Sequence, residues 1–381
     1  MFAISADPSS PQQRYKPGAT NIELLSVSVP LTDNSCIQAN RTTRSREVPE
    51  HGLRSDSRLG RIIRILADNA TVVVSGTKLA HEIDTNRSEV WRLVQQLRAF
   101  GVEITGHPAT GYQLASVPDL LLPEALEPLV KGTMFAREIN HYFRVGSTNV
   151  EGMQAAANGA PEGSVFIAEE QTAGRGRAGH SWVSEPSSGI YVSVILRPQI
   201  APADALLLSL IAGIAAVDAV VEVTGLRPDI RWPNDLLIGD KKFCGILTEM
   251  NAEVTRVRYA VVGIGINVNQ HSFPSELDAI ATSLQLAAGH PWSRVALAAA
   301  LLKSLDSEYR QLVSRDIAEA RRAIYDRFQQ RSSYARGKRV HVDENGGYDG
   351  VTAGLDERGF LLIQTDVGMR TVLSGDVRSI E

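Results

Sequence analysis

The sequence predicts an α+β protein of several domains: a winged helix-turn-helix first, a mixed-sheet α/β domain in the centre, and a small SH3-like β-barrel last. Three observations support this prediction. The 381 residues leave room for two or three domains, and 43% hydrophobic with 22% charged residues is ordinary for a globular protein. Residues 58–114 show helical periodicity followed by a hairpin pattern. Strand and helix patterns then alternate up to residue 330, and only short β patterns with turns follow.

Charge, cysteine content and apolar runs restrict the class of protein. The net charge of −4 gives no overall signature of polyanion binding, so any contact with nucleic acid needs a local patch. Cys36 lies in a polar segment and Cys244 in an apolar strand pattern, which predicts no disulfide and a reducing cytoplasm. We identify no apolar run long enough to span a membrane and no basic start with an apolar stretch. We therefore expect neither a membrane partner nor a secretory signal.

Residues 1–56 are expected to form a disordered extension. Ser, Pro, Asn, Thr and Arg dominate this segment, which has no sustained periodicity and only one short apolar patch, at 22–30. We assign no chemistry to it.

Residues 57–116 have the pattern of a winged helix-turn-helix. A first helix begins near residue 58, and a second short helix is predicted over 76–83. Asn86 with Glu89 resembles a capping box, and it opens a third helix with one apolar stripe. A hairpin follows, with strands expected over 102–105 and 111–114.

Four polar residues of the third helix lie off its apolar stripe, where a recognition helix would present them to DNA. They are Arg87, Ser88, Arg92 and Gln95, with Gln96 as an alternative to Gln95. A small helical module for protein contacts is the other interpretation, because the local charge is only mildly basic.

Residues 117–134 are expected to form a linker with a short helix, residues 135–334 a central domain, and residues 335–381 a small all-β unit with turns at 345–347 and 356–359. The central strands are predicted at 140–145, 164–170, 189–196, 229–232, 236–238, 243–250 and 257–268. The central helices are predicted at 150–157, 203–223, 293–313 and 317–330.

A Gly/Arg loop, Gly174–Gly179, joins two of the predicted central strands. Glycine lets backbone amides approach a ligand closely, and the arginine fork suits carboxylates and phosphates. The loop is interpreted as an anion cradle, a flexible surface loop or an RNA-binding Arg/Gly segment. Because it has too little apolar surface to be ordered by its own packing, we expect an anionic ligand to order it.

Two further stretches indicate a ligand site. Gly146–Asn149 gathers small hydrogen-bonding residues where a helix begins, which fits an N-cap, a polar-ligand site or both. Gly263 and Gly265 interrupt an apolar strand, which indicates close approach by a ligand or another backbone, or else a bulge.

Five motifs thus occur in order along the chain. They are Ser147–Asn149, Gln171 with Gly174–Gly179, Arg231–Asp235, Lys242–Leu247 and Gly263–Asn267. Together they resemble the biotin protein ligases, over roughly residues 58–381. The winged helix makes the chain similar to the bifunctional kind, which also represses biotin biosynthesis genes. The resemblance implies a class II aminoacyl-tRNA synthetase-like fold for the central domain.

The resemblance also implies a two-step reaction that uses ATP, Mg²⁺ and biotin. Biotin carboxylate attacks the α-phosphate of ATP to give biotinyl-5′-AMP. A lysine of the biotin carboxyl carrier protein of acetyl-CoA carboxylase then attacks this mixed anhydride. Since the first step joins two anions, cations and N–H donors are needed where charge develops. No general base for the second step is evident from the sequence.

Residues at matching positions take their expected roles from the resemblance. The catalytic residues would be Lys242, Arg177 and Arg175. Biotin would contact Ser147, Thr148, Asn149, Gln171, Arg175, Gly176, Arg177, Lys242, Gly245, Gly263 and Gly265. ATP or the adenylate would contact Arg175, Arg177, Trp182, Asn234, Lys242 and Asn267. Asp235 would bind the metal or orient the lysine. The expected partners are operator DNA and, with adenylate bound, a second copy that pairs the winged helices on a palindromic site.

Two positions depart from the family pattern, which usually has Arg at His180 and Lys at Arg231. Arg231 keeps the charge, whereas any charged role at position 180 is in doubt because histidine is mostly neutral at pH 7. Two alternatives to a biotin ligase remain open. One is a lipoate protein ligase-like acyl transferase, which shares the central fold, and the other is a ligand-sensing transcription factor without ligase activity.

Overall fold

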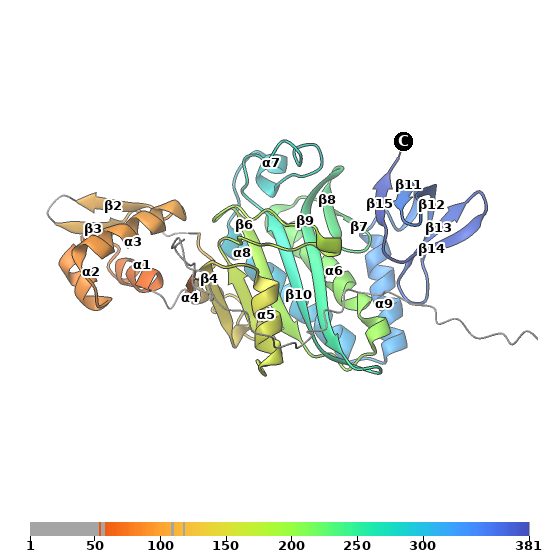
Figure 1. Ribbon diagram of the computed structural model, residues 1–381, viewed down its shortest axis with the longest axis horizontal. Coiled ribbons are helices and arrows are strands. Elements are labelled where there is room, and N and C mark those ends of the chain that lie inside the picture. The colour runs from red at the N-terminus through yellow and green to blue at the C-terminus, as the bar shows by residue number, and fades with distance from the viewer. Residues whose placement is uncertain (1–52, 55–57, 108–109, 117–118, 381) are drawn as a thin grey trace, which may run out of the picture.

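The computed structural model describes residues 53–54, 58–107, 110–116 and 119–380 (Figure 1). The expected disordered extension, residues 1–56, lies outside the described residues except for Leu53–Arg54. These two residues form strand β1, which pairs antiparallel with strand β4 (Ile139–Arg144). The expectation of disorder is therefore wrong for them, because the edge of the central sheet supplies backbone hydrogen-bond partners.

The N-terminal module has the predicted three helices and hairpin. Its elements are α1 (Arg58–Asp68), α2 (Gly76–Glu82), α3 (Arg87–Ala99), β2 (Ile104–His107) and β3 (Gly111–Leu114). Asn86 caps α3, since its Oδ1 accepts a hydrogen bond from the Glu89 amide at 3.0 Å. The Glu89 carboxylate pairs with Arg92 instead of the Asn86 amide, so only half of the expected capping box forms.

The module packs directly on the central domain. Its apolar core includes Leu120 of the linker and Phe143 of β4. Phe100, at the end of α3, lies against Phe143 with ring centroids 5.4 Å apart. The linker, which carries the short helix α4 (Pro123–Leu126), is therefore packed against the two domains that it connects.

A mixed sheet of eight strands forms the central domain, in the order β1-β4-β5-β6-β10-β9-β8-β7. Strands β4 and β5 pair in parallel, and the other neighbours pair antiparallel. The remaining strands are β5 (Val165–Ala168), β6 (Gly189–Leu196), β7 (Asp229–Arg231), β8 (Asp235–Ile238), β9 (Lys241–Ala252) and β10 (Val257–Asn267). The helices are α5 (Thr148–Ala157), α6 (Leu206–Thr224), α7 (Leu284–Ala288), α8 (Arg294–Val313) and α9 (Ile317–Gln330). Only α7 has no counterpart among the predicted helices.

Helices cover both faces of this sheet, with α5 on one face and α6, α8 and α9 on the other (Figure 1). The strands are apolar on both sides as a result. In β5, Val165 and Ile167 belong to the core on the α6 side, whereas Phe166 and Ala168 belong to the core on the α5 side. The sheet is thus enclosed, and its loops are left to form a site.

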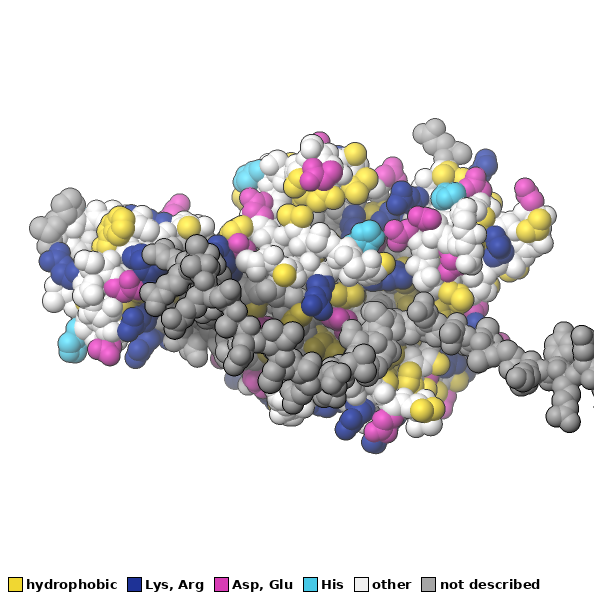
Figure 2. Space-filling view, viewed as in Figure 1, with side chains coloured by type: hydrophobic (Ala, Val, Ile, Leu, Met, Phe, Trp, Pro, Cys, Tyr) yellow, Lys and Arg dark blue, Asp and Glu magenta, His cyan; other side chains and the backbone are white. Residues whose placement is uncertain are grey.

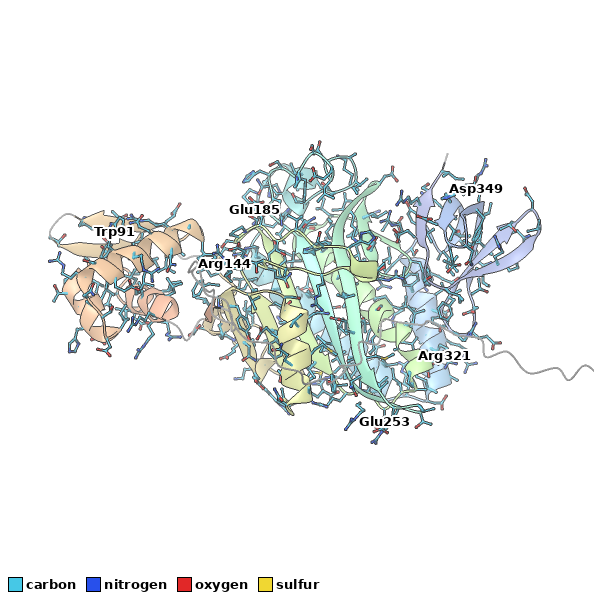
Figure 3. The ribbon with its side chains drawn as sticks, viewed as in Figure 1. Trp91, Arg144, Glu185, Glu253, Arg321 and Asp349 are labelled. Atoms are coloured by element: carbon cyan, nitrogen blue, oxygen red, sulfur yellow. The ribbon has the colours of Figure 1, made fainter. Side chains whose placement is uncertain are left out.

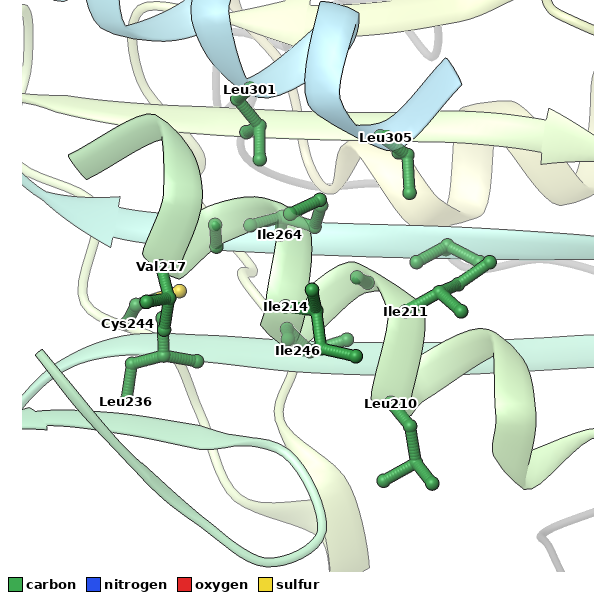
Figure 4. Close-up of a cluster of buried hydrophobic side chains, with 14 of the residues drawn as sticks. Leu210, Ile211, Ile214, Val217, Leu236, Cys244, Ile246, Ile264, Leu301 and Leu305 are labelled. Atoms are coloured by element: carbon green, nitrogen blue, oxygen red, sulfur yellow. The ribbon is translucent and has the colours of Figure 1, made fainter. Parts of the chain in front are cut away.

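Helix α6 is apolar over most of its surface because it lies between the sheet and α8. Figure 4 shows its packing against both, through Leu210, Ile211, Ile214, Val217, Leu236, Cys244, Ile246, Ile264, Leu301 and Leu305. The run Pro202–Thr224 is long and apolar enough to cross a membrane by length and composition, with mean hydropathy 2.2. The expectation that the chain has no such run is therefore wrong. Of the most apolar part, 67% is buried inside the molecule, as in the core helix of a globular domain.

The C-terminal domain is a small, all-antiparallel sheet in the order β14-β13-β12-β11-β15. Its strands are β11 (Arg336–Asp343), β12 (Tyr348–Leu355), β13 (Leu361–Thr365), β14 (Gly368–Val372) and β15 (Asp376–Ser379). Trp232 of the central domain anchors it. The buried indole Nε1 donates to the Gly359 carbonyl at 2.9 Å, and the ring lies 6.5 Å from Phe360.

Candidate active site

One cavity gathers most of the residues that the sequence motifs indicate. It is lined by Ser147, Thr148, Asn149, Gln171, Arg175, Gly176, Arg177, Trp182, Tyr191, Val192, Asn234, Lys242, Gly245, Leu247, Gly263, Ile264 and Gly265. Of the expected contact residues, only Asn267 does not line it. Asn267 is buried, and its Nδ2 donates to the Thr282 carbonyl at 3.1 Å. Asp235 does not line the cavity either, but it forms an ion pair with Lys242, which does.

The start of α5 forms the polar end of this cavity. Ser147 occupies the N-cap position but makes no side-chain capping bond, which leaves its hydroxyl available to a ligand. The amide and hydroxyl of Thr148 both donate to Gln171 Oε1, at 2.9 and 3.1 Å. Asn149 Nδ2 donates to Glu249 Oε2 at 3.0 Å. The motif residues therefore hold one another in fixed orientations.

Ser193 is a polar residue of this site that no motif indicated. Its hydroxyl is buried in β6, 2.8 Å from Thr148 Oγ1 and 2.6 Å from Asn149 Oδ1. It therefore links Thr148 and Asn149, two of the polar side chains that line the cavity.

We expect Ser193→Ala to raise the KM for the small molecule that occupies this cavity by about tenfold, because the buried Asn149 oxygen loses a hydrogen-bond partner. Steady-state kinetics with the concentration of that molecule varied measure this. Ser209→Ala is the matched control, since the Ser209 hydroxyl bonds Thr248 away from the cavity. Equal KM values for both variants would contradict the assignment.

Gly263 and Gly265 make room for two side chains. A Cβ atom on Gly263 would lie 2.0 Å from Asn149 Oδ1, and one on Gly265 would lie 2.6 Å from Trp182 Cε2. Strand β10 keeps an unbroken register with both neighbours across these positions, so the bulge interpretation is wrong. The close approach is by the protein's own side chains rather than by another backbone.

The backbone of the Gly/Arg loop is held by hydrogen bonds to the residues that follow it. The Gly176 amide donates to the His180 carbonyl at 2.7 Å, and the Trp182 amide donates to the Gly174 carbonyl at 2.9 Å. Hydrogen bonds rather than apolar packing thus hold the loop backbone, and the ordering of the loop by an anionic ligand stays a prediction. His180 closes the loop through its backbone carbonyl. Its exposed side chain takes no part in this contact, so the loop does not require arginine at this position.

The two arginines of the loop have different surroundings. Arg177 Nη1 donates to Asn234 Oδ1 at 2.9 Å, and Nη2 donates to the Ser374 carbonyl at 3.2 Å. Burial lowers the pKa of Arg177, although Asp235 and a carboxylate of the C-terminal domain oppose this effect. Arg175 is exposed at the cavity, and its side chain has no partner among the described residues. Arg177 is thus positioned in advance, whereas Arg175 is free to meet an anion.

Lys242 is held over the cavity by Asp235, with Nζ 2.5 Å from Oδ1. Arg231 Nη2 lies 2.6 Å from the other oxygen, Oδ2. Burial alone would raise the pKa of Asp235, but Lys242 and Arg231 outweigh it and hold the pKa below its usual range. Both carboxylate oxygens thus face a cation. The geometry therefore favours the lysine-orienting role of Asp235 over metal binding, and it gives the unusual Arg231 a partner.

An apolar rim lies beside this cavity. The backbone of Lys242 bonds the segment before α7. Its amide donates to the Ile280 carbonyl, and its carbonyl accepts from the Thr282 amide. Val183, Ile280 and Leu286 are exposed by 46%, 59% and 48%. Figure 2 shows the hydrophobic side chains that gather over α7 at the top of the molecule. The segment that pairs with Lys242 therefore carries an exposed apolar side chain, Ile280.

The outer face of α3 forms a second candidate surface. Arg87, Ser88 and Arg92 are exposed and Gln95 is half-buried, although Arg92 is paired with Glu89 at 2.6 Å. Trp91 is 58% exposed at the centre of this helix, and Figure 3 shows it on the N-terminal module. Sequence reasoning missed Trp91 because a tryptophan beside an apolar stripe is read as part of the core.

Three family models match the N-terminal module, the central domain and the C-terminal domain in turn. The HTH domain matches residues 58–113, the biotin/lipoate A/B protein ligase family 147–267, and the biotin protein ligase C-terminal domain 337–378. The bifunctional ligase/repressor BirA of Bacillus subtilis is 34% identical over 83% of this chain and 97% of its own length. The chain belongs to this ligase/repressor family. The predicted family, fold class and enzyme class, a biotin–[acetyl-CoA-carboxylase] ligase, are confirmed.

Two further relatives extend the comparison. The biotin–[acetyl-CoA-carboxylase] ligase of Mycobacterium tuberculosis is 37% identical over 63% of this chain and 88% of its own length. The biotin protein ligase of Aquifex aeolicus, solved in complex with biotin and ATP, is 29% identical with a TM-score of 0.55. The match covers 64% of this ligase and all of the Aquifex chain.

Proposed function

We propose that this ligase activates biotin with ATP in the cavity around Lys242 and transfers it to a lysine of a biotin carboxyl carrier protein. The observation that carries the proposal is the meeting of three features in one cavity. These are a lysine clamped by a carboxylate, a Gly/Arg loop and the polar start of a helix. The biotin and ATP in the Aquifex complex support the choice of substrates.

The polar end of the cavity would hold the ureido ring of biotin. Ser147 has a hydroxyl without a capping bond, and Gln171, Ser193 and Asn149 fix the neighbouring donors and acceptors. Convergent polar groups that fix the orientation of a ligand are typical of small-molecule sites. The valeryl chain would then run toward Lys242.

The cationic end would stabilise the first step. A biotin carboxylate oxygen forms a bond to the α-phosphorus, the bond to the bridging oxygen breaks, and pyrophosphate leaves. Lys242 and Arg177 are already oriented by Asp235 and Asn234, so they need little reorganisation as negative charge develops. Arg175 would bind the phosphates from the exposed side.

The second step transfers the acyl group. The amine of the carrier lysine attacks the acyl carbon of biotinyl-5′-AMP, and AMP leaves with the bonding electrons while the amine loses a proton. We assign no described side chain as the base. We propose that the carrier approaches over the apolar rim of Val183, Ile280 and Leu286, because these side chains are exposed and the backbone of Ile280 pairs with Lys242.

Magnesium stays a prediction. Among the described residues, no group of three or more His, Cys, Asp or Glu side chains could hold a metal ion. These residues do not fit a resident ion, so we derive no step through it. Comparing pyrophosphate release with and without Mg²⁺ tests whether the substrate needs the ion.

A transfer assay tests the proposed function directly. The ligase is incubated with ATP, Mg²⁺, a carrier domain, and either biotin or lipoate, and the carrier is weighed by mass spectrometry. We expect addition of biotin and no addition of lipoate. Transfer of lipoate alone would favour the lipoate ligase alternative, and transfer of neither would favour a sensor without ligase activity.

We further propose that the N-terminal module binds operator DNA through α3, and that a cytoplasmic location brings the ligase to DNA, ATP and carrier alike. Arg87, Ser88, Trp91, Arg92 and Gln95 supply the side chains on its outer face. In this arrangement arginines contact phosphates or guanine, and the Trp91 ring contacts thymine methyl groups in the major groove.

We also propose that the adenylate-bound ligase dimerises. Strand β9 pairs with β8 only as far as Gly245, so beyond that point its outer edge has no strand partner among the described residues. An open edge of this kind is a template for pairing with a second copy.

Biotinyl-5′-AMP is expected to promote the dimer and to tighten operator binding, and Arg177→Gly is expected to weaken both effects. By linkage, operator DNA then tightens adenylate binding. Sedimentation with and without biotinyl-5′-AMP, alongside operator titrations at fixed salt, measures the coupling. An unchanged mass and an unchanged DNA affinity would refute the coupling but not the ligase assignment.

A further inference from the structure

Arg177 is held between two domains. Its Nη1 donates to Asn234 Oδ1 at 2.9 Å, and its Nη2 donates to the Ser374 carbonyl of the C-terminal domain at 3.2 Å. Asn234 is itself fixed to β9, because its Nδ2 and its carbonyl both bond Ile246, at 2.8 and 2.9 Å. The orientation of Arg177 therefore depends on how firmly the turn around Ser374 is held.

One carboxylate holds that turn. Glu344 Oε1 accepts hydrogen bonds from the Leu373 amide at 3.0 Å, the Ser374 amide at 2.8 Å and the Ser374 hydroxyl at 3.3 Å. Packing contributes little, because Leu373 is 46% exposed and Ser374 is also exposed. Backbone amides that donate to an ionised carboxylate make stronger hydrogen bonds than neutral pairs do.

The turn is shaped to receive this side chain. A Cβ atom on Gly375 would lie 2.7 Å from Glu344 Cβ and 3.0 Å from the Asp343 carbonyl oxygen. Only glycine allows the turn to lie this close to β11 and the residue after it. The domain as a whole is anchored separately, through Trp232 and Gly359. Loss of the Glu344 contacts would thus loosen the turn without undocking the domain.

We propose that Glu344 is a positioning residue for the Gly/Arg loop. It fixes the Leu373–Gly375 turn, the Ser374 carbonyl then orients the Arg177 guanidinium, and the C-terminal domain thereby helps to shape the ATP end of the cavity. The part of the inference that concerns ATP rests on the proposed function. The part that predicts the mobility of the backbone around Arg177 concerns the loop alone.

The first test therefore does not depend on ligase activity. Trypsin cleaves after Arg175 and Arg177 when the loop opens, and mass spectrometry measures the rate of each cut in the full chain. Glu344→Ala is expected to raise the cleavage rate at Arg177 by about fivefold, because the turn loses a charge-assisted anchor. Asp349→Asn is the control, since Asp349 pairs with His341 at the surface of the same domain (Figure 3). Equal cleavage rates in the two variants would overturn the proposal.

The second test measures adenylate formation with the same variants. Glu344→Ala is expected to raise the KM for ATP by about tenfold with a smaller change in kcat, whereas Glu344→Gln, which keeps an oxygen acceptor, restores part of the loss. In a double-mutant cycle with Arg177→Ala, the two effects should not add, because Glu344 acts through Arg177. Fully additive effects would overturn the proposal. Inactivity of the unmodified ligase would instead count against the proposed function and leave the cleavage result standing.

Discussion

Lys242→Ala is expected to slow formation of biotinyl-5′-AMP by about 10²–10³-fold, the range for removal of one group that stabilises developing charge. Lys242 is the cavity cation that Asp235 holds at 2.5 Å, close to where biotin carboxylate and ATP must meet. The fold should survive, because Asp235 keeps its ion pair with Arg231. Biotin-dependent release of pyrophosphate is the measurement.

A neighbouring lysine provides the control for this substitution. Lys241 is exposed, and its Nζ donates to the Asp278 carbonyl outside the cavity. Lys241→Ala should therefore leave the rate close to that of the unmodified ligase. Pyrophosphate release that is unchanged in Lys242→Ala, or equally reduced in both variants, would refute the assigned role of Lys242.

Removal of residues 58–116 is expected to abolish specific DNA binding, a loss of about 10³-fold or more relative to an operator. The catalytic domain should still fold, because its sheet and helices have a core of their own. The truncation exposes Leu120 and Phe143, however, which the module covers in the intact chain. Operator titration and circular dichroism measure the two outcomes, and specific binding by the truncated ligase would contradict the winged-helix assignment.

Substitutions on the intact module test the same surface without exposing this apolar joint. Arg87→Ala and Trp91→Ala change exposed side chains of α3, so neither should alter the melting temperature much. Both should weaken binding to operator DNA, and Trp91→Ala should reduce the preference for the operator over random DNA. Normal operator binding by both variants would place the DNA surface elsewhere.

Local patterns were enough to predict most of the fold. Helix α3 is marked by an N-cap and an apolar stripe, and β6 by an apolar run that only Ser193 interrupts between Ile190 and Leu196, so their positions follow from neighbouring residues alone. The run Pro202–Thr224 is as long and as apolar as a membrane span, so its length and composition alone do not say that it lies in a globular core. Only the fold places the sheet and α8 around it.

The motifs predicted the lining of the cavity but not the contacts that position it. Ser193 follows no motif, because one serine in an apolar strand carries no signal of its partners. Ser374 lies 197 positions after Arg177, and no local pattern links two residues so far apart. Buried ion pairs were equally invisible. Arg294 meets Glu169 only when α8 packs against the sheet. Burial would raise the pKa of Glu169, but Arg294 and His141 together outweigh it and hold the pKa at about 2.

The ligand retained after incubation with biotin, lipoate and ATP tests the central claim most directly. The full-length ligase is separated from free nucleotide, and the bound compound is released and identified by mass spectrometry. A cavity with a polar end for the ureido ring and a cationic end around Lys242 predicts biotinyl-5′-AMP, at close to one per chain, and its loss in Lys242→Ala. Retention of lipoyl-AMP instead, or of unreacted biotin with no adenylate under any condition, would contradict the account.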